Sequence, residues 1–199
     1  YSLELSDKGR INLINTLSNQ FSVSSAKKTF KDCIFIEADG NDYSISKIFK
    51  KALENEDFRK HISELISFGL DRYHTRYKHS ILNNTPFAIY EKYNYEQVCQ
   101  LLEWPQNEVP LNIGGYKYHR ETKTYPVFIN YHKGEGIQDS IKYEDRFESP
   151  TLIKAISKNN RSFTSDDVVS AFDADSLDIA MHLFVRKNKD DEESKEFYY

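Results

Sequence analysis

Apolar residues recur at helical spacing through much of the first 85 residues of the chain. Ser or Asp precedes each apolar run, and these residues cap helices by accepting hydrogen bonds from exposed backbone N–H groups. The helices predicted in this way begin at Ser6-Asp7, Ser24-Ser25, Ser44 and Asp57. Gly69 is predicted to end the last of them, because glycine readily adopts the left-handed conformation found at helix ends. A short strand at residues 33–36 and a turn at residues 39–42 interrupt the helical pattern.

The polar segment from Asp71 to Thr85 is either an extension of the last helix or a linker. It contains a basic cluster, which either forms a solvated face or contacts the backbone of a nucleic acid. The sequence Asn83-Asn84-Thr85-Pro86 indicates a break, because proline disfavours helix at the preceding residue. We therefore predict a mostly helical domain over residues 1–85 and a second domain over residues 86–199.

Strands predominate in the second domain. One helix is expected at residues 95–104, where Trp104-Pro105 ends it. Residues 113–118 and 125–131 flank a polar turn, which predicts a hairpin. Further strands are expected at residues 138–147, 179–186 and 197–199, and further helices after Ser149-Pro150 and after Ser165. The pattern as a whole predicts an α+β fold.

Charge is unevenly distributed, although the chain as a whole carries a net charge of −4. Residues 116–163 contain nine Lys or Arg and six Asp or Glu, a net charge of +3. Residues 164–199 contain four Lys or Arg and ten Asp or Glu, a net charge of −6. A basic centre attracts phosphate groups even in an acidic protein. Mixed charge on a sheet surface is the alternative explanation.

Seven aromatic residues lie within the 32 positions from Tyr116 to Phe147, and basic residues sit among them. Planar rings, cations and a few carboxylates are the groups that hold nucleobases and their phosphates. A sheet that is merely rich in tyrosine explains the same composition, because aromatic residues favour strands.

Several kinds of chemistry have no signature in the sequence. No Gly-x4-Gly-Lys phosphate loop is present, and the six histidines show no metal-ligand spacing. Cys33 and Cys99 form no disulfide framework, which favours a reducing compartment. No apolar run is long enough to span a membrane, and no N-terminal signal is present. We therefore expect a cytoplasmic binding domain with no catalytic residue, no metal site and no cofactor.

Several motifs of the second domain, in order, resemble a known family. They are Glu91-Lys-Tyr-x-Tyr95, Leu101-Leu-x-Trp104, Gly114-Gly-Tyr116, Pro126-Val-Phe-x-x-Tyr-His-Lys133, Tyr143-Glu-Asp-Arg-Phe-x-Ser-Pro150 and Leu183-Phe-Val-Arg-Lys187. Together they resemble the domain at the C-terminus of many bacterial helicase-like proteins. The nearest resemblance is to the C-terminal region of SauUSI-type type IV restriction endonucleases, which depend on modified cytosine and on ATP. Residues 1–85 resemble the helical region that couples the motor to the reader. The abrupt ends of the chain predict that it is part of a longer protein.

The resemblance implies a module that binds 5-methylcytosine or 5-hydroxymethylcytosine in double-stranded DNA by base flipping. It also implies a curved, barrel-like sheet with flanking helices, similar to the SET-and-RING-associated fold. Helicase and nuclease domains of the parent chain are then further partners, and the isolated chain is a binding domain without enzyme activity. A protein-interaction module that couples the motor to its nuclease without base recognition is the alternative. A cryptic nuclease is a third possibility.

The candidate site residues follow from this implied function. Asp145 is the first candidate to accept a hydrogen bond from the cytosine amino group, and Glu144 is the second. Adjacent residues of a strand point to opposite faces, so we expect only one of them in the pocket. The rings proposed for the pocket are Tyr143, Phe147, Tyr131 and Tyr118, and the proposed contacts to the DNA backbone are His132, Lys133, Arg146, Lys154, Lys158 and Arg161. A structural salt bridge of Asp145, and simple packing of Tyr118 beside Tyr116, are the alternatives.

Overall fold

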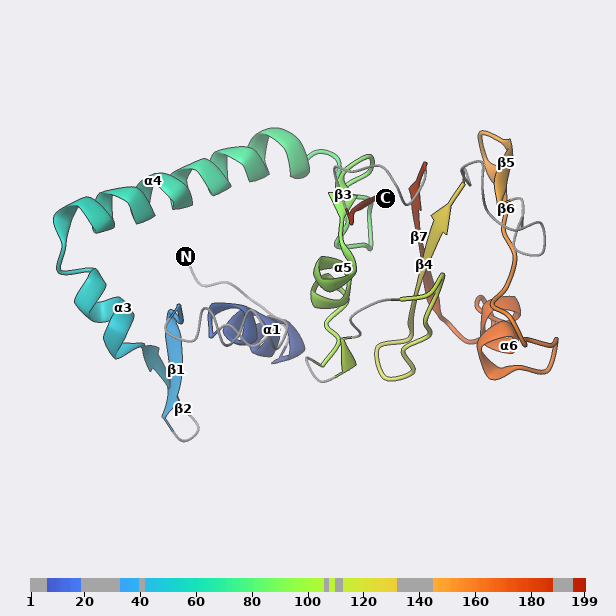
Figure 1. The fold of residues 1–199 in the computed structure, drawn as a ribbon, viewed down its shortest axis with the longest axis horizontal. Helices are drawn as coiled ribbons and strands as arrows, with labels where there is room; N and C mark the ends of the chain where they lie inside the picture. The colour runs from blue at the N-terminus through green and yellow to red at the C-terminus, as the bar shows by residue number, and fades with distance from the viewer. Residues whose placement is uncertain are drawn as a thin grey trace. The chain divides into compact units, whose positions relative to one another are not determined.

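The computed structural model describes residues 7–18, 33–39, 42–105, 108–109, 113–131, 145–187 and 195–199 (Figure 1). The chain divides into two compact units. The first unit is drawn from Tyr1–Ala88 and Glu103–Val109, and the second from Ile89–Leu102 and Pro110–Tyr199.

The described part of the first unit contains one hairpin and three helices. The helices are α1 (Asp7–Leu17), α3 (Lys47–Ala52) and α4 (Glu56–Arg72), and the strands β1 (Ile36–Asp39) and β2 (Asp42–Ile45) pair antiparallel. Ser46 caps α3 by accepting a hydrogen bond from the N–H of Phe49, and Asn55 caps α4 through the N–H of Phe58. The predicted starts at Ser44 and Asp57 therefore lie close to the observed caps. The helix predicted after Ser24-Ser25 lies outside the described residues.

Helix α4 is longer than the sequence pattern predicts. It passes through Gly69 and ends at Arg72, where the π-helical turn η1 (Tyr73–Tyr77) continues the chain. The prediction that Gly69 ends the helix is wrong, because the N–H of Tyr73 donates to the carbonyl oxygen of Gly69 and extends the hydrogen-bond ladder. Glycine costs an interior helical position only about 1 kcal/mol relative to alanine, so a single glycine does not terminate a long helix.

A chain of aromatic contacts ties the start of α4 to the rest of the first unit. Phe35 contacts Phe49 edge-on, with 4.7 Å between ring centroids, and Phe49 contacts Phe58 at 6.1 Å. Edge-to-face pairs of this kind contribute about 0.5–1.5 kcal/mol beyond the area that they bury. No residue of α4 is buried, and within the described part of the chain these contacts anchor the helix at its first turn.

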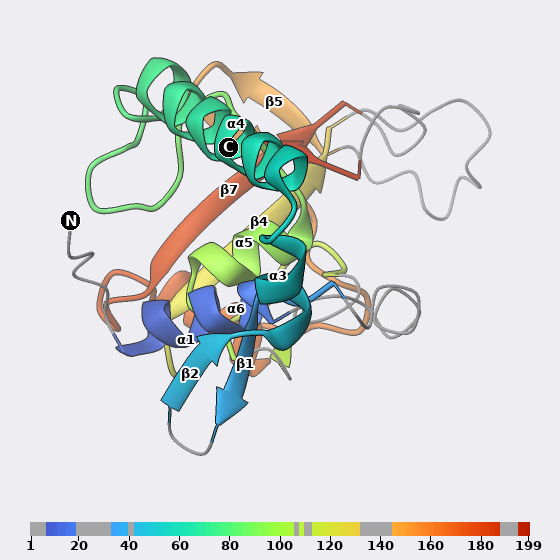
Figure 2. The ribbon, with the colours of Figure 1, turned by 90° about the vertical axis from the view of Figure 1, so that its left-hand side faces the viewer.

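The second unit is built on a four-stranded sheet in the order β3–β8–β7–β4. Its strands are β3 (Lys92–Tyr93), β4 (Thr124–Asn130), β7 (Ala180–Arg186) and β8 (Phe197–Tyr198). Strands β4 and β7 lie side by side and pair in parallel, whereas β8 runs antiparallel to β3 and β7 (Figures 1 and 2). A parallel pair requires a long crossover, and here residues 131–179 supply it, including α6 (Asp166–Phe172).

Buried aromatic rings hold this sheet together. Phe128 of β4 and Phe184 of β7 are neighbours in the parallel register and stack with ring centroids 4.9 Å apart. Phe197 of β8 packs edge-on against Phe128 at 5.1 Å. Tyr95, the first residue of helix α5 (Tyr95–Leu101), contacts Phe128 at 4.5 Å. A capping box between Asn94 and Gln97 fixes the start of α5, so this helix packs on the sheet through Tyr95.

Residues 149–156 form a turn and a strand where the sequence predicts a helix. Strands β5 (Arg146–Ser149) and β6 (Leu152–Lys154) pair antiparallel, with Phe147 beside Ile153. The Ser149 hydroxyl accepts a hydrogen bond from the N–H of Thr151 at 3.3 Å. The helix prediction is wrong because the fixed φ of Pro150 suits a turn as well as a helix start.

The hairpin predicted for residues 113–118 and 125–131 is present only in part. Isolated antiparallel bridges join Tyr116 to Val127 and His119 to Thr124, but only the second arm becomes a regular strand, β4. Gly115 has a φ of +80°, a left-handed conformation that interrupts the first arm.

These elements confirm the predicted α+β class. Within the described residues the strands form an open four-stranded sheet and two hairpins, and they close into no barrel. Every helix of the described chain is too short or too polar to cross a lipid bilayer.

The two cysteines differ sharply in accessibility, and we expect them to differ in reactivity. Burial raises the pKa of the Cys99 thiol to about 12, whereas Cys33 is exposed. Because the thiolate is the reactive form, iodoacetamide at neutral pH should modify Cys99 roughly tenfold or more slowly than Cys33. Peptide mass spectrometry over time measures both sites in one sample, with the unfolded chain as the control. Equal rates in the folded chain would contradict the burial of Cys99.

His182 predicts a loss of stability on acidification. It lies buried in β7, and burial lowers its pKa below the ordinary value of 6.5. The unfolded chain therefore takes up a proton at a higher pH than the folded chain, and stability falls as the pH drops below 6.5 toward the folded pKa. In thermal unfolding, the melting temperature should fall more steeply between pH 7 and 5 for the parent chain than for His182→Gln. Parallel pH profiles would show that another group is responsible.

Candidate nucleic-acid interface

Three tyrosine rings stack against one another in the second unit. Tyr125, at the start of β4, lies 5.6 Å from Tyr116 and 5.8 Å from Tyr118 between ring centroids, in stacked geometry. The bridges that join residues 116–119 to β4 bring the two outer rings to Tyr125. Tyr125 is buried, and it packs with Ala174 and Ile179. The stack is thus part of the core on one side.

Helix α6 is tied to this stack by a hydrogen bond. The Tyr125 hydroxyl donates to the carbonyl oxygen of Asp167 at 2.8 Å. Burial, followed by the proximity of Tyr116 and Asp167, raises the pKa of Tyr125 well above its usual range. Tyr125 therefore stays a neutral hydrogen-bond donor.

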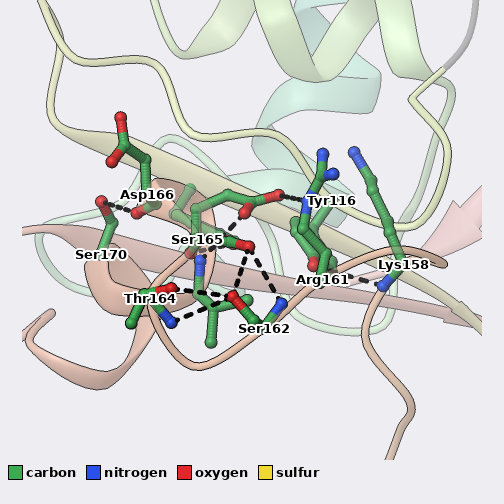
Figure 3. A network of polar contacts seen from close by, with 11 residues as sticks. Tyr116, Lys158, Arg161, Ser162, Thr164, Ser165, Asp166 and Ser170 are labelled. Atoms are coloured by element: carbon green, nitrogen blue, oxygen red, sulfur yellow. Dashed lines mark hydrogen bonds and ion pairs between the residues drawn. The ribbon is translucent and has the colours of Figure 1, made fainter.

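Two cations from the crossover lie beside Tyr116 (Figure 3). The backbone N–H of Lys158 donates to the Tyr116 hydroxyl at 3.3 Å, and the Lys158 ammonium lies 4.7 Å from the centroid of that ring. Arg161 forms an ion pair with Asp167, with 2.7 Å between Nε and Oδ2. Its pKa is raised by that hydrogen bond and charge, and further by Tyr116.

The cations are close enough to repel one another. Burial lowers the pKa of Lys158, Asp167 raises it, and Arg161 and Lys117 both lower it. The opposing charge of Asp167 is engaged by Arg161 at short range. We call the set of Tyr116, Tyr118, Tyr125, Lys117, Lys158 and Arg161 the tyrosine–cation cluster. Like charges held together in this way favour an anionic partner.

Hydroxyl groups fix the loop that carries these cations into α6 (Figure 3). The Ser162 and Thr164 hydroxyls are 2.9 Å apart, and the N–H of Ser162 donates to the Ser165 hydroxyl at 3.0 Å. The Ser170 hydroxyl donates to the carbonyl oxygen of Asp166 at 2.7 Å. Short-range bonds of this type fix the conformation of the loop.

A second aromatic group lies at the other end of the crossover. Tyr131, directly after β4, meets Phe147 of β5 edge-on, with 5.5 Å between ring centroids. The two residues are 37 % and 45 % exposed, so part of each ring faces solvent. Asp145, directly before β5, accepts a hydrogen bond from the N–H of Ile156 at 3.0 Å through Oδ1. This bond closes the open end of the β5–β6 hairpin.

The predicted site residues therefore fall into separate groups. Tyr118, Lys158 and Arg161 belong to the tyrosine–cation cluster, where Tyr118 packs against Tyr125. Tyr131 and Phe147 meet as an exposed pair.

The hairpin holds two of the proposed DNA-backbone contacts. Arg146 pairs with Glu148 at 3.0 Å and faces Lys154 across the β5–β6 hairpin. The predicted residues that lie outside the described part of the chain are His132, Lys133, Tyr143 and Glu144.

Sequence reasoning missed the central members of the cluster. Tyr125 reads as an ordinary strand residue and Asp167 as part of a helix start, and nothing local links positions 42 residues apart. Lys117 alternates with Tyr116 and Tyr118 along the sequence, which predicts the opposite face of a strand, so no local signal links its charge to their rings.

Comparisons with known proteins identify families without a known role. Residues 87–199 match a family described as Domain of unknown function (DUF3427), and residues 1–77 match one described as Domain of unknown function (DUF8090). No curated protein and no solved structure matches the chain.

Removing the Tyr125 hydroxyl should destabilise the second unit. Tyr125→Phe keeps the stacked ring but loses the hydrogen bond to Asp167, which we expect to cost about 1 kcal/mol of unfolding free energy. Tyr118→Phe is the matched control, because Tyr118 contributes its ring to the same stack. Urea unfolding measures both variants. A Tyr125→Phe variant that is as stable as Tyr118→Phe would show that the hydrogen bond contributes nothing to the free energy of unfolding.

Proposed function

The chain belongs to the DUF3427 family through residues 87–199, and we propose that it is a DNA-reading module. Its ligand is 5-methylcytosine or 5-hydroxymethylcytosine in double-stranded DNA. In the full protein it serves a cytoplasmic, ATP-dependent type IV restriction enzyme, whose helicase and nuclease domains are its partners in the same chain. The module itself carries out no reaction.

The observation that carries this proposal is the convergence of Lys158 and Arg161 on Tyr116, one of the stacked tyrosines. Burial and neighbouring cations disfavour the charged form of Lys158, and a phosphate group would relieve that repulsion. DNA supplies a regular row of phosphates, and contacts to them provide affinity that does not depend on sequence. The cluster therefore suits the role of positioning the duplex.

Base recognition is assigned to the Tyr131–Phe147 pair and to Asp145. Stacking of a nucleobase on an exposed aromatic ring contributes about 1–3 kcal/mol of binding free energy. That gain offsets the few kcal/mol needed to extrude a base from the duplex. A carboxylate has about four lone-pair sites and can accept several hydrogen bonds at once, so the bond from the N–H of Ile156 to Asp145 is compatible with a bond from the cytosine amino group. Asp145 supplies an acceptor for an exocyclic amino group two residues before one of these rings, which supports its assignment to the modified base.

The direct test is a titration of the whole chain against matched duplexes. The duplexes carry cytosine, 5-methylcytosine or 5-hydroxymethylcytosine at one site, and fluorescence anisotropy measures binding at fixed salt. We expect a preference of roughly tenfold or more for a modified duplex, which corresponds to about 1.4 kcal/mol. Equal affinity for all three would reject base reading but leave backbone binding, and no binding would reject both.

Phe147→Ala should remove most of the preference for modified DNA and leave binding to the unmodified duplex within about twofold, because it loses a ring–base contact. Phe172→Ala is the matched control, since Phe172 is an exposed phenylalanine of α6. The same anisotropy titration measures both. A preference unchanged by Phe147→Ala would place the base elsewhere.

Lys158→Met should weaken binding to all duplexes alike and reduce the salt slope of log K by about 1, because one phosphate contact is lost. The methionine keeps an apolar stem against Tyr116. Lys51→Ala, on the exposed side of α3, is the control. A loss confined to modified duplexes would instead place Lys158 at the base.

A further inference from the structure

Lys158 is held against an aromatic ring at both its backbone and its amine. Its ammonium lies 4.7 Å from the centroid of the Tyr116 ring, and its backbone N–H donates to the Tyr116 hydroxyl. The side chain of Arg161 lies beside the same tyrosine (Figure 3). Lys158 is only partly exposed, so its amine is desolvated in part but still reachable from solvent.

The surroundings of this amine favour its neutral form. Burial is the largest cause and lowers the pKa of Lys158, and the charges of Arg161 and Lys117 lower it further. Asp167 acts in the opposite direction, but its carboxylate is paired with Arg161 at 2.7 Å. The Tyr116 ring also favours the ammonium. The net shift of the pKa is downward nonetheless, which increases the fraction of neutral amine at neutral pH.

A lysine in this setting has the properties of a nucleophile. Nucleophilic lysines are activated by desolvation or by a neighbouring cation, and Lys158 has both. The charges beside the amine also select the electrophile. An acyl phosphate carries its leaving group as an anion, and the cations Lys117 and Arg161 attract anions to this position.

We propose that Lys158 is a site of acylation, and that acyl phosphates are the donors. The neutral amine attacks the acyl carbon, a C–N bond forms, and the C–O bond to the phosphate group breaks. Inorganic phosphate leaves with the bonding electrons, and the nitrogen releases one proton to water. The product is an uncharged amide, so the chain loses one cation and its contact with the Tyr116 ring.

The consequence for DNA rests on the proposed function. If Lys158 contacts a phosphate of the duplex, its acylation removes that contact from every duplex, modified or not. Acylation then weakens DNA binding without changing the preference for modified cytosine. A bound duplex in turn covers Lys158 and slows its acylation.

Acetylation of the whole chain by acetyl phosphate, with no DNA present, tests the reactivity. Peptide mass spectrometry follows each lysine separately over time. Near neutral pH, Lys158 should be acetylated roughly threefold or more faster than Lys154, an exposed lysine of β6. As the pH is raised, the rate at Lys158 should level off at a lower pH than the rate at Lys154. Equal or slower acetylation of Lys158 would overturn the proposal.

Substitution of a neighbouring arginine tests the cause of the reactivity. Arg161→Gln removes a cation and releases Asp167, and both changes raise the pKa of Lys158, so its acetylation should slow toward the rate of an ordinary lysine. Arg120→Gln is the matched control, because it breaks an equivalent ion pair with Asp166 at 2.9 Å. The control should leave the rate at Lys158 unchanged. Equal rates in the two variants would reject activation by Arg161.

A chain synthesised with acetyl-lysine at position 158 tests the consequence for DNA. In the anisotropy titration, its salt slope of log K should be smaller by about 1 than that of the unmodified chain. Unchanged DNA binding by the acetylated chain would reject the effect on DNA but leave the acylation site. An unmodified chain that binds no duplex would reject the proposed function, and the acetylation rates would still decide the reactivity of Lys158.

Discussion

The parallel pairing of β4 and β7 is the constraint on which the candidate site depends. The pair runs in register from Thr124 beside Ala180 to Asn130 beside Arg186. A chain leaving β4 must return to the start of β7, so residues 131–179 have to travel back along the sheet. That return places the loop of Lys158 and the start of α6 against the tyrosines at the beginning of β4. The hydrogen bond from Tyr125 to Asp167 fixes the arrangement.

The candidate site combines a firmly packed stack of tyrosine rings with cations that repel one another. The tyrosine stack shares its packing with the core through Ala174 and Ile179, so the rings have little freedom. The cations above it repel one another, and the carboxylate that opposes them is held by Arg161. A protein that needed only stability would gain by separating these charges. Their retention on an ordered loop is the physical argument for an anionic ligand.

Local sequence patterns predicted the elements better than their partners. Alternation, capping residues and apolar spacing predict strands β7 and β8, the helix starts near Ser46 and Asn55, and the α+β class. The sequence did not predict that β4 pairs in parallel with β7, because strand pairing between distant segments leaves no mark in local periodicity. Ser149-Pro150 and Gly69 were misread, since each residue type suits two local structures.

The residues of the candidate site likewise divide into those that the sequence predicted and those that only the tertiary structure reveals. Lys158 and Arg161 were proposed as contacts to the DNA backbone among the basic residues of positions 116–163, and the structure brings both to Tyr116. Asp167 and Tyr125 entered only with the tertiary structure, because their contact spans the crossover. The meeting of Tyr131 with Phe147 likewise depends on how the crossover begins.

The central claim is that the tyrosine–cation cluster contacts DNA. NMR spectra of the chain with labelled tyrosine rings and lysine side chains, recorded during addition of a methylated duplex, test it most directly. The account predicts that the signals of Tyr116 and Lys158 shift in proportion to bound duplex, and that they shift with unmodified DNA as well. Saturating binding that leaves both signals unchanged would contradict it.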